Sequence, residues 1–95
     1  YLVKLIEVLP SESLSLQSHN HRSEHWTVVS GVAQVQIGEI LKTLKANQFI
    51  EIPKGAKHRL TNLGESTLVI IEVQLGDKID EDDITRYEDK YGRDG

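Results

Sequence analysis

The sequence has 95 residues, of which 38% are hydrophobic and 27% charged, a composition typical of one folded domain. Its formal net charge of −4 argues against nucleic acid or an anionic membrane as a partner, and its longest aliphatic run, residues 68–71, is far shorter than a membrane span. The absence of cysteine excludes disulfides, thiolate metal sites and cysteine nucleophiles, and it fits a cytoplasmic location.

The first half of the chain contains short runs in which hydrophobic and polar residues alternate with a period of two, as in half-buried β-strands. Strands are predicted at residues 3–8, 14–19, 25–30 and 33–37. Gly38 and Glu39 follow as a two-residue hairpin turn with glycine first, the order that a type II′ turn prefers.

The second half continues this pattern and then changes near residue 80. Further strands are predicted at residues 40–44, 49–52, 58–61 and 68–74. An acidic turn then precedes Ile84, Tyr87 and Tyr91, whose spacing of three and four predicts an amphipathic helix over residues 80–92. The sequence therefore predicts a single all-β domain, a barrel over residues 1–79 with a C-terminal helix packed on it.

Three of the four histidines lie within seven positions, in the segment "SLQSHNHRSEHW". On a strand, residues 17 and 19 point to the same face, and a carboxylate at the start of the next strand can face them. A fourth histidine follows a Pro-Lys-Gly turn. Two imidazoles, one carboxylate and one amide suit a divalent metal such as zinc, manganese, iron or cobalt. The predicted ligands are Gln17, His19, Glu24 and His58.

The spacing around these residues resembles the first motif of the cupin family. That motif runs glycine, five residues, His-x-His, three or four residues, glutamate, six residues, glycine. Here Ser11, Gln17, His19, Glu24 and Gly31 occupy its positions. Serine therefore replaces the first turn glycine, and glutamine replaces the first metal-binding histidine.

The second cupin motif is also matched at every interval. It runs glycine, five residues, Pro-x-Gly, two residues, histidine, three residues, asparagine, and Asn47, Pro53, Gly55, His58 and Asn62 occupy its positions. Asparagine stands where the family has a turn glycine, a replacement that a backbone with positive φ tolerates.

Longer strings narrow the resemblance. "LSLQSHNHRSEHW", "IPKGAKHRL" and "EDDITRYEDKYGR" together resemble the C-terminal domain of the type II bifunctional mannose-1-phosphate guanylyltransferase/mannose-6-phosphate isomerases, over nearly the whole chain. The resemblance implies a cupin barrel (double-stranded β-helix or jelly roll), a divalent metal with zinc favoured, and interconversion of mannose 6-phosphate and fructose 6-phosphate. It also implies a covalently linked N-terminal nucleotidyltransferase domain, which these 95 residues lack, and a homodimer formed through cupin strands.

Several basic residues are candidates for binding the phosphate of such a substrate. Arg22 lies in the turn beside the predicted metal ligands, and its planar guanidinium suits a phosphate, so that it is also a candidate for a direct part in catalysis. Lys54 and Lys57 flank the turn before His58, and Arg86 lies on the predicted helix. The alternative is that these are ordinary solvated surface charges or, for Arg86, the partner of Asp82 or Asp83.

The proton-transferring group has three candidates. Glu72 stands in "LVIIEVQ", which is apolar on both faces, so burial is expected to raise its carboxyl pKa toward the range of a general base. His21 and His25 are the others, although strand alternation places His25 opposite Glu24 and Trp26. Trp26 itself is expected to pack in the core rather than to stack on a sugar.

Two rival functions stay open at this point. One is a non-catalytic cupin that binds a sugar phosphate or serves as an assembly module for another catalytic domain. The other is an iron-dependent oxygenase, which the glutamine at position 17 disfavours. Fold alone does not decide among them, because one fold can host many activities.

Overall fold

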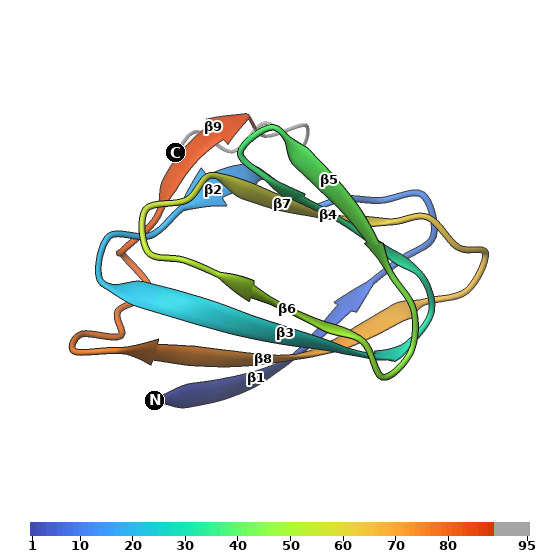
Figure 1. The fold of residues 1–95 in the computed structure, drawn as a ribbon, viewed down its shortest axis with the longest axis horizontal. Helices are drawn as coiled ribbons and strands as arrows, with labels where there is room; N and C mark the ends of the chain where they lie inside the picture. Colours follow the sequence, from blue (N-terminus) through green and yellow to red (C-terminus); the bar gives the residue numbers. More distant parts are fainter. Residues whose placement is uncertain (89–95) are drawn as a thin grey trace.

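Residues 1–88, the part of the chain that the structure describes, form nine β-strands in two facing sheets of a computed structural model (Figure 1). The first sheet has the order β1-β8-β3-β6 and the second the order β5-β4-β7-β2-β9. Neighbouring strands are antiparallel throughout. The strands of the first sheet are β1 (Leu2–Val8), β8 (Leu68–Gly76), β3 (Arg22–Ser30) and β6 (Phe49–Ile52). Those of the second sheet are β5 (Ile40–Leu44), β4 (Ala33–Ile37), β7 (His58–Asn62), β2 (Leu16–Ser18) and β9 (Thr85–Glu88).

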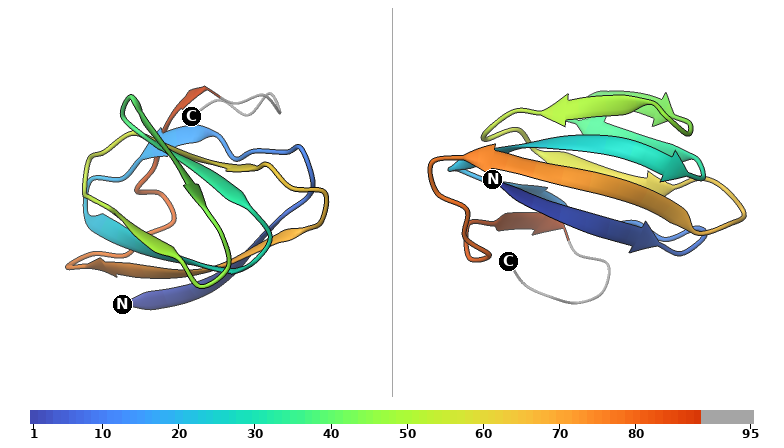
Figure 2. Two further views of the ribbon diagram at one scale, coloured as in Figure 1. Left: turned by 45° about the vertical axis from the view of Figure 1, so that its right-hand side comes forward. Right: turned by 90° about the horizontal axis from the view of Figure 1, so that it is seen from below.

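The views in Figure 2 show the two sheets facing each other, and the core lies between them. Alternate residues of the strands point inward, and Val28, Val35, Leu60 and Ile70 are completely buried there. The prediction of an all-β barrel is confirmed.

The interior changes from apolar to polar along the central strands. In β3 the buried residues are Val28 and Trp26 toward one end and Glu24 and Arg22 toward the other. The antiparallel register sets Trp26 opposite Glu72 and Glu24 opposite Gln74 on β8. Because strand alternation brings all of these side chains inward, the buried polar groups gather at one end of the barrel.

The turn residues explain two departures from the cupin motifs. Ser11 and Asn47, which stand where the family has glycine, both adopt positive φ, at 67° and 73°. Gly38 has a φ of 58°, whereas Glu39 is not among the residues with positive φ, as a type II′ turn requires. Ile37 and Ile40 pair across this turn, so the predicted hairpin is confirmed.

The predicted C-terminal helix is wrong over the described residues. Residues 85–88 form β9, which pairs with β2, and Asp80–Asp83 form a turn closed by the bond from the Asp83 amide to the Asp80 carbonyl. The short strand β2 has β7 along one edge, and β9 satisfies the backbone groups of the other edge. Residues 89–92 of the predicted helix lie outside the described part. Within residues 1–88 the structure has no helix long and apolar enough to cross a membrane.

Candidate metal centre

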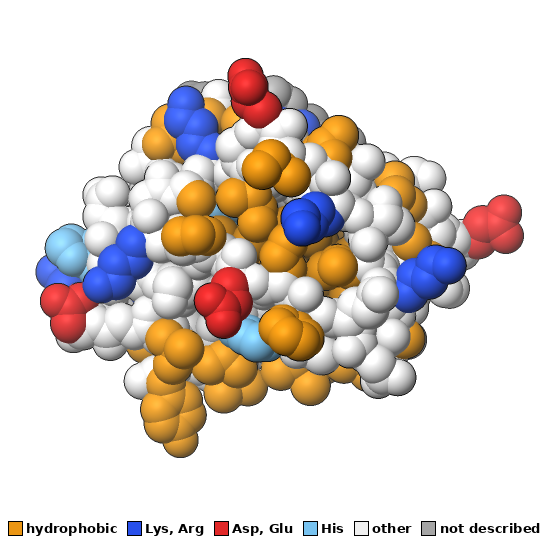
Figure 3. Space-filling model, viewed as in Figure 1, with side chains coloured by type: hydrophobic (Ala, Val, Ile, Leu, Met, Phe, Trp, Pro, Cys, Tyr) orange, Lys and Arg blue, Asp and Glu red, His pale blue; other side chains and the backbone are white. Residues whose placement is uncertain are grey.

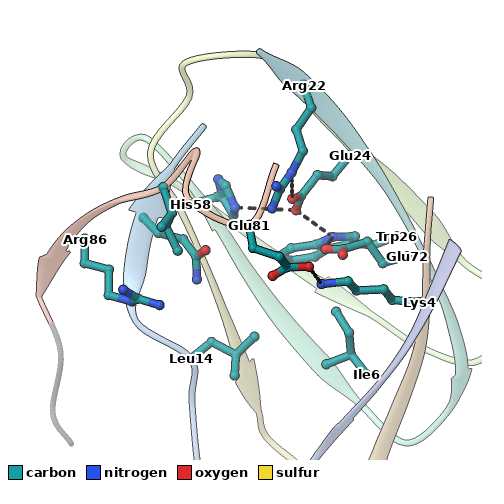
Figure 4. Close-up of a pocket in the computed structure, with 12 residues that line it drawn as sticks. Lys4, Ile6, Leu14, Arg22, Glu24, Trp26, His58, Glu72, Glu81 and Arg86 are labelled. Atoms are coloured by element: carbon teal, nitrogen blue, oxygen red, sulfur yellow. Dashed lines mark hydrogen bonds and ion pairs between the residues drawn. The ribbon is translucent and has the colours of Figure 1, made fainter. Parts of the chain in front are cut away.

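Three predicted ligands meet at the polar end of the barrel. His19 follows β2, Glu24 lies in β3 and His58 begins β7, and one ligand atom from each lies within 4.8 Å of the others. His19 Nε2 is 3.2 Å from Glu24 Oε2, and His58 Nε2 is 3.6 Å from Glu24 Oε1. None of the three is more than 3% exposed. Figure 4 shows Glu24 and His58 pointing toward one another, joined by a dashed line.

Backbone carbonyls orient both imidazoles. His19 Nδ1 lies 2.7 Å from the carbonyl oxygen of Asp83, and His58 Nδ1 lies 2.9 Å from that of Ala56. Since a carbonyl only accepts, each Nδ1 carries the proton and each Nε2 directs a lone pair toward Glu24. Burial lowers the pKa of His58 to about 4 and also lowers the pKa of His19, so both rings are neutral at pH 7. Two neutral imidazoles and a carboxylate at these positions fit a divalent cation.

Gln17 lies next to the cluster. It is opposite His58 in the register of β2 and β7, and it lines the same cavity. Its amide Nε2 is 3.3 Å from the Ser15 carbonyl oxygen, to which it donates a weak hydrogen bond. Gln17 is therefore placed beside the cluster, with its nitrogen directed back along its own strand.

Arg22 is buried against the cluster, so it is not the solvated surface charge that the sequence left open as an alternative. Its Nε donates to Glu24 Oε2 at 2.9 Å, and one terminal nitrogen contacts the Asp80 carbonyl oxygen at 3.3 Å. Its other terminal nitrogen is 3.4 Å from His19 Nε2. The guanidinium therefore balances the charge of Glu24, and its hydrogen bonds hold it in place.

Trp26 connects two carboxylates. Its indole N–H points at Glu72 Oε2, 2.9 Å away, and at Glu24 Oε1, 3.2 Å away, while Gln74 donates to the other Glu72 oxygen at 2.7 Å. Glu72 is buried, as expected, and its burial and the nearby charge of Glu24 raise its pKa. Trp26 is 2% exposed and its ring meets His58 edge-on, so it packs in the core, although it also borders the cavity beside the cluster.

A cavity of about 230 Å³ opens beside the cluster (Figure 4). Glu24, His58 and Glu72 line it together with the basic residues Lys4, Arg22 and Arg86. Arg86 reaches it from β9. Lys4 was not predicted from the sequence. Its signal is a charge at an inward position of a strand in which residues 2, 6 and 8 are partly or fully buried.

Apart from His19, which belongs to the cluster but does not line this cavity, four predicted site residues lie outside it. They are His21, His25, Lys54 and Lys57. His21 is exposed and lines a separate acidic hollow with Asp80 and Asp83. His25 stacks on Phe49 at 4.9 Å, on the outer side of β3. Lys54 is exposed in a turn, and Lys57 lies over the Tyr87 ring.

Asp83 is a second residue that sequence reasoning missed. Its carboxylate accepts hydrogen bonds from the backbone amides of Asn20 and His21, both at 2.8 Å, while its carbonyl accepts from His19. One residue of the turn before β9 thereby fixes both the turn between β2 and β3 and a ring of the cluster. The acidic run that suggested a helix is thus explained by this turn.

Two facing antiparallel sheets with a buried histidine and carboxylate cluster at one end define a barrel of the cupin, or double-stranded β-helix, class. The capsular polysaccharide assembling protein CapF from Staphylococcus aureus matches with a TM-score of 0.80 at 22% identity, over 90% of this chain and 28% of its own. An uncharacterized conserved protein with a double-stranded β-helix domain from Klebsiella pneumoniae matches with a TM-score of 0.79 at 24% identity, over 90% of this chain and 73% of its own. At these identities the likeness establishes the fold.

Sequence similarity identifies the family to which the chain belongs. The model of the family described as mannose-6-phosphate isomerase C-terminal matches residues 1–89, and the chain belongs to this family. Mannose-1-phosphate guanylyltransferase ManC of Salmonella typhimurium is 52% identical over 93 residues, which are 98% of this chain and 19% of the relative. Xanthan biosynthesis protein XanB of Xanthomonas campestris and alginate biosynthesis protein AlgA of Pseudomonas putida are each 54% identical over 98% of this chain. The chain thus spans about a fifth of the length of these relatives.

Proposed function

We propose that this domain interconverts mannose 6-phosphate and fructose 6-phosphate with the help of a divalent metal. The observation that carries the proposal is the shared cavity, in which Glu24 and His58 of the cluster lie beside Arg22 and Arg86. A metal site and positive charge in one small cavity suit a phosphorylated sugar. Membership of the mannose-6-phosphate isomerase C-terminal family supports the same reaction.

The proposed ligands are His19, Glu24 and His58, with Gln17 as a fourth oxygen donor. Zinc is the favoured ion, and cobalt, manganese and iron are the alternatives, because a mixed nitrogen and oxygen set accepts all four. When bound, a divalent cation supplies positive charge that polarises the carbonyl group of the sugar.

The isomerisation moves a proton between C2 of the aldose and C1 of the ketose. Of the three candidates for this transfer, Glu72 is the one supported by position, since it lines the cavity whereas His21 and His25 do not. Its raised pKa brings the carboxyl closer to neutral pH, where a group can both take and return a proton. Arg86 is the supported phosphate ligand among the predicted set, because Lys54 and Lys57 lie outside the cavity and the guanidinium of Arg22 is bonded to Glu24 and to the Asp80 carbonyl.

The test is isomerisation of mannose 6-phosphate by the full chain, coupled to detection of fructose 6-phosphate. Metal-stripped protein is expected to be inactive, and added zinc is expected to restore turnover. The His58→Ala variant is expected to be inactive both without metal and with added zinc. Turnover that is independent of added metal and unchanged in His58→Ala would contradict the proposal. Metal and sugar phosphate binding without turnover would favour the non-catalytic module, and oxygen consumption with iron would favour the oxygenase.

We also propose a covalently linked nucleotidyltransferase domain and a cytoplasmic location for the full protein. The support for the linked domain is that ManC carries the name mannose-1-phosphate guanylyltransferase and is about five times longer than the matched region. The guanylyltransferase activity is accordingly not assigned to these 95 residues.

The homodimer expected from the sequence is proposed to form through the outer face of the four-stranded sheet. Leu5, Ile71 and Phe49 lie in one row of this sheet, with Thr27 of β3 between Ile71 and Phe49, and their exposures are 64%, 40% and 60%. Val3 and Leu75 extend the apolar surface. Hydrophobic side chains gather along the lower edge of Figure 3, over β1 and β8. An exposed apolar patch of this kind is typical of an interface, and we assign it to a second copy of the chain.

Leu5→Lys is expected to reduce the mass of the full chain in sedimentation from dimer to monomer, because the charge would be buried between two apolar faces. The matched control is Leu41→Lys, at a similarly exposed leucine on β5 in the other sheet. A dimer that survives Leu5→Lys, or dissociates equally in both variants, would show that this face is not the interface.

A further inference from the structure

Lys4 occupies an unusual place for a lysine. It is in β1, an edge strand, and it points inward in line with Leu2 and Ile6, while Val3 and Leu5 face the outside. Its side chain lines the cavity beside the cluster and is 37% exposed. A charge in this position either protects the edge strand or serves a ligand in the cavity.

The partner of Lys4 is loosely held. Lys4 Nζ lies 2.6 Å from Glu81 Oε1, and the Glu81 side chain is 77% exposed in the turn that leads to β9. Figure 4 shows the two residues meeting at the cavity, with Arg86 on another side of it. The ammonium of Lys4 lowers the pKa of Glu81. An exposed ion pair of this kind contributes little net free energy, so an incoming anion can replace the carboxylate.

Arg22 is not available in the same way. It is 8% exposed, and its guanidinium is bonded to Glu24 and to the Asp80 carbonyl. Turning it toward a substrate would leave the buried Glu24 charge without its partner, which is costly. Lys4 therefore offers a charge that can move to a ligand without disrupting the cluster.

We propose that Lys4 is a phosphate-binding residue and that Glu81 occupies the position of the phosphate until a phosphomonoester displaces it. The inference rests on the proposed function, since it assigns a further residue to the same substrate. The doubly charged phosphate of a sugar phosphate accepts from Lys4 Nζ more strongly than the single carboxylate does, and Arg86 lines the same cavity to share the charge. Glu81 then acts as a competitor that excludes weakly charged ligands.

The test uses the zinc-loaded full chain and measures binding of mannose 6-phosphate, inorganic phosphate and mannose by titration calorimetry. Lys4→Gln is expected to weaken binding of both phosphate ligands about tenfold or more and to leave mannose binding unchanged. Glu81→Gln is expected to strengthen phosphate binding several-fold. In the Lys4→Gln background, Glu81→Gln is expected to have no effect. Lys42→Gln, an exposed lysine of β5 away from the cavity, is the matched control.

Unchanged phosphate binding in Lys4→Gln would overturn the inference and leave Lys4 as a guard of the edge strand. Weaker phosphate binding in Glu81→Gln would overturn the inference as well, because removing a carboxylate that competes with phosphate for Lys4 should strengthen phosphate binding. The proposed function fails separately. If the chain binds phosphate through Lys4 but does not isomerise the sugar, this inference stands and the proposed isomerase function is contradicted. If the chain is an active isomerase whose KM is unchanged by Lys4→Gln, the proposed function stands and this inference is contradicted.

Discussion

Glu24→Gln is expected to lower the zinc affinity of the full chain by more than about 100-fold and to abolish isomerisation. Loss of a residue that only supports the metal ligands typically lowers metal affinity about 10- to 100-fold. A larger effect is expected for Glu24, because it is the carboxylate that the Nε2 atoms of both histidines approach. Glutamine keeps the size of the side chain but removes the negative charge that a divalent cation needs. Zinc affinity measured by competition with a chelator, without any assay of activity, checks the first part.

Glu72→Gln is the matched comparison for Glu24→Gln. Both carboxylates are buried and both accept from the Trp26 indole, but Glu72 is not among the mutually close ligand atoms. We expect Glu72→Gln to abolish turnover but to lower zinc affinity by no more than about tenfold relative to the unchanged chain. This is the smallest effect typical of residues outside the ligand set. Equal loss of zinc in the two variants would show that Glu24 does not bind the metal, and full turnover in Glu72→Gln would remove Glu72 as the base.

The metal-free chain is expected to become less stable as the pH falls from about 6.5 to about 4. His58 has a folded-state pKa of about 4 because burial disfavours its charged form, against 6.5 when it is unfolded. Between these values the unfolded state binds a proton that the folded state does not, so acidification favours unfolding by about 1.4 kcal/mol per pH unit. The full effect is about 3 kcal/mol. The lowered pKa of His19 acts in the same direction.

Glu72 opposes this trend, because its raised folded-state pKa means that the folded chain takes up a proton before the unfolded chain does. Urea unfolding of chelator-treated protein at several pH values between 7 and 4 measures the balance. His58→Asn, which cannot titrate, is expected to flatten the slope. A slope equal to that of the unchanged chain would show that His58 is not the residue responsible.

The strands were predictable because their signals are local. Alternation and turn residues located eight of the nine strands, although β3 begins at Arg22, three residues earlier than predicted. The ninth strand was missed because Ile84 and Tyr87 have a helical spacing, while the partner that makes residues 85–88 a strand is β2, far away in the sequence. Such a long-range pairing leaves no local pattern, and it overrides the local preference.

The cluster of His19, Glu24 and His58 was predictable because a motif fixes both residue type and spacing. His19, Glu24 and His58 came from the motif intervals, and strand alternation correctly separated His25 from Glu24. Lys4 was missed because β1 is apolar on both of its faces, so its alternation does not reveal which face is inward. Asp83 was missed because its role depends on backbone groups at residues 20 and 21.

The position of Asp83 also has a consequence for the order in which the protein is made. The carbonyl that orients His19 and the strand that borders β2 both come from residues 83–88, whereas the other parts of the cluster are synthesised much earlier. β1 likewise cannot form its strand pairing until β8 has been synthesised. The histidines are therefore synthesised long before their positions are fixed, and the histidine and carboxylate cluster can assemble only when translation of the domain is almost complete.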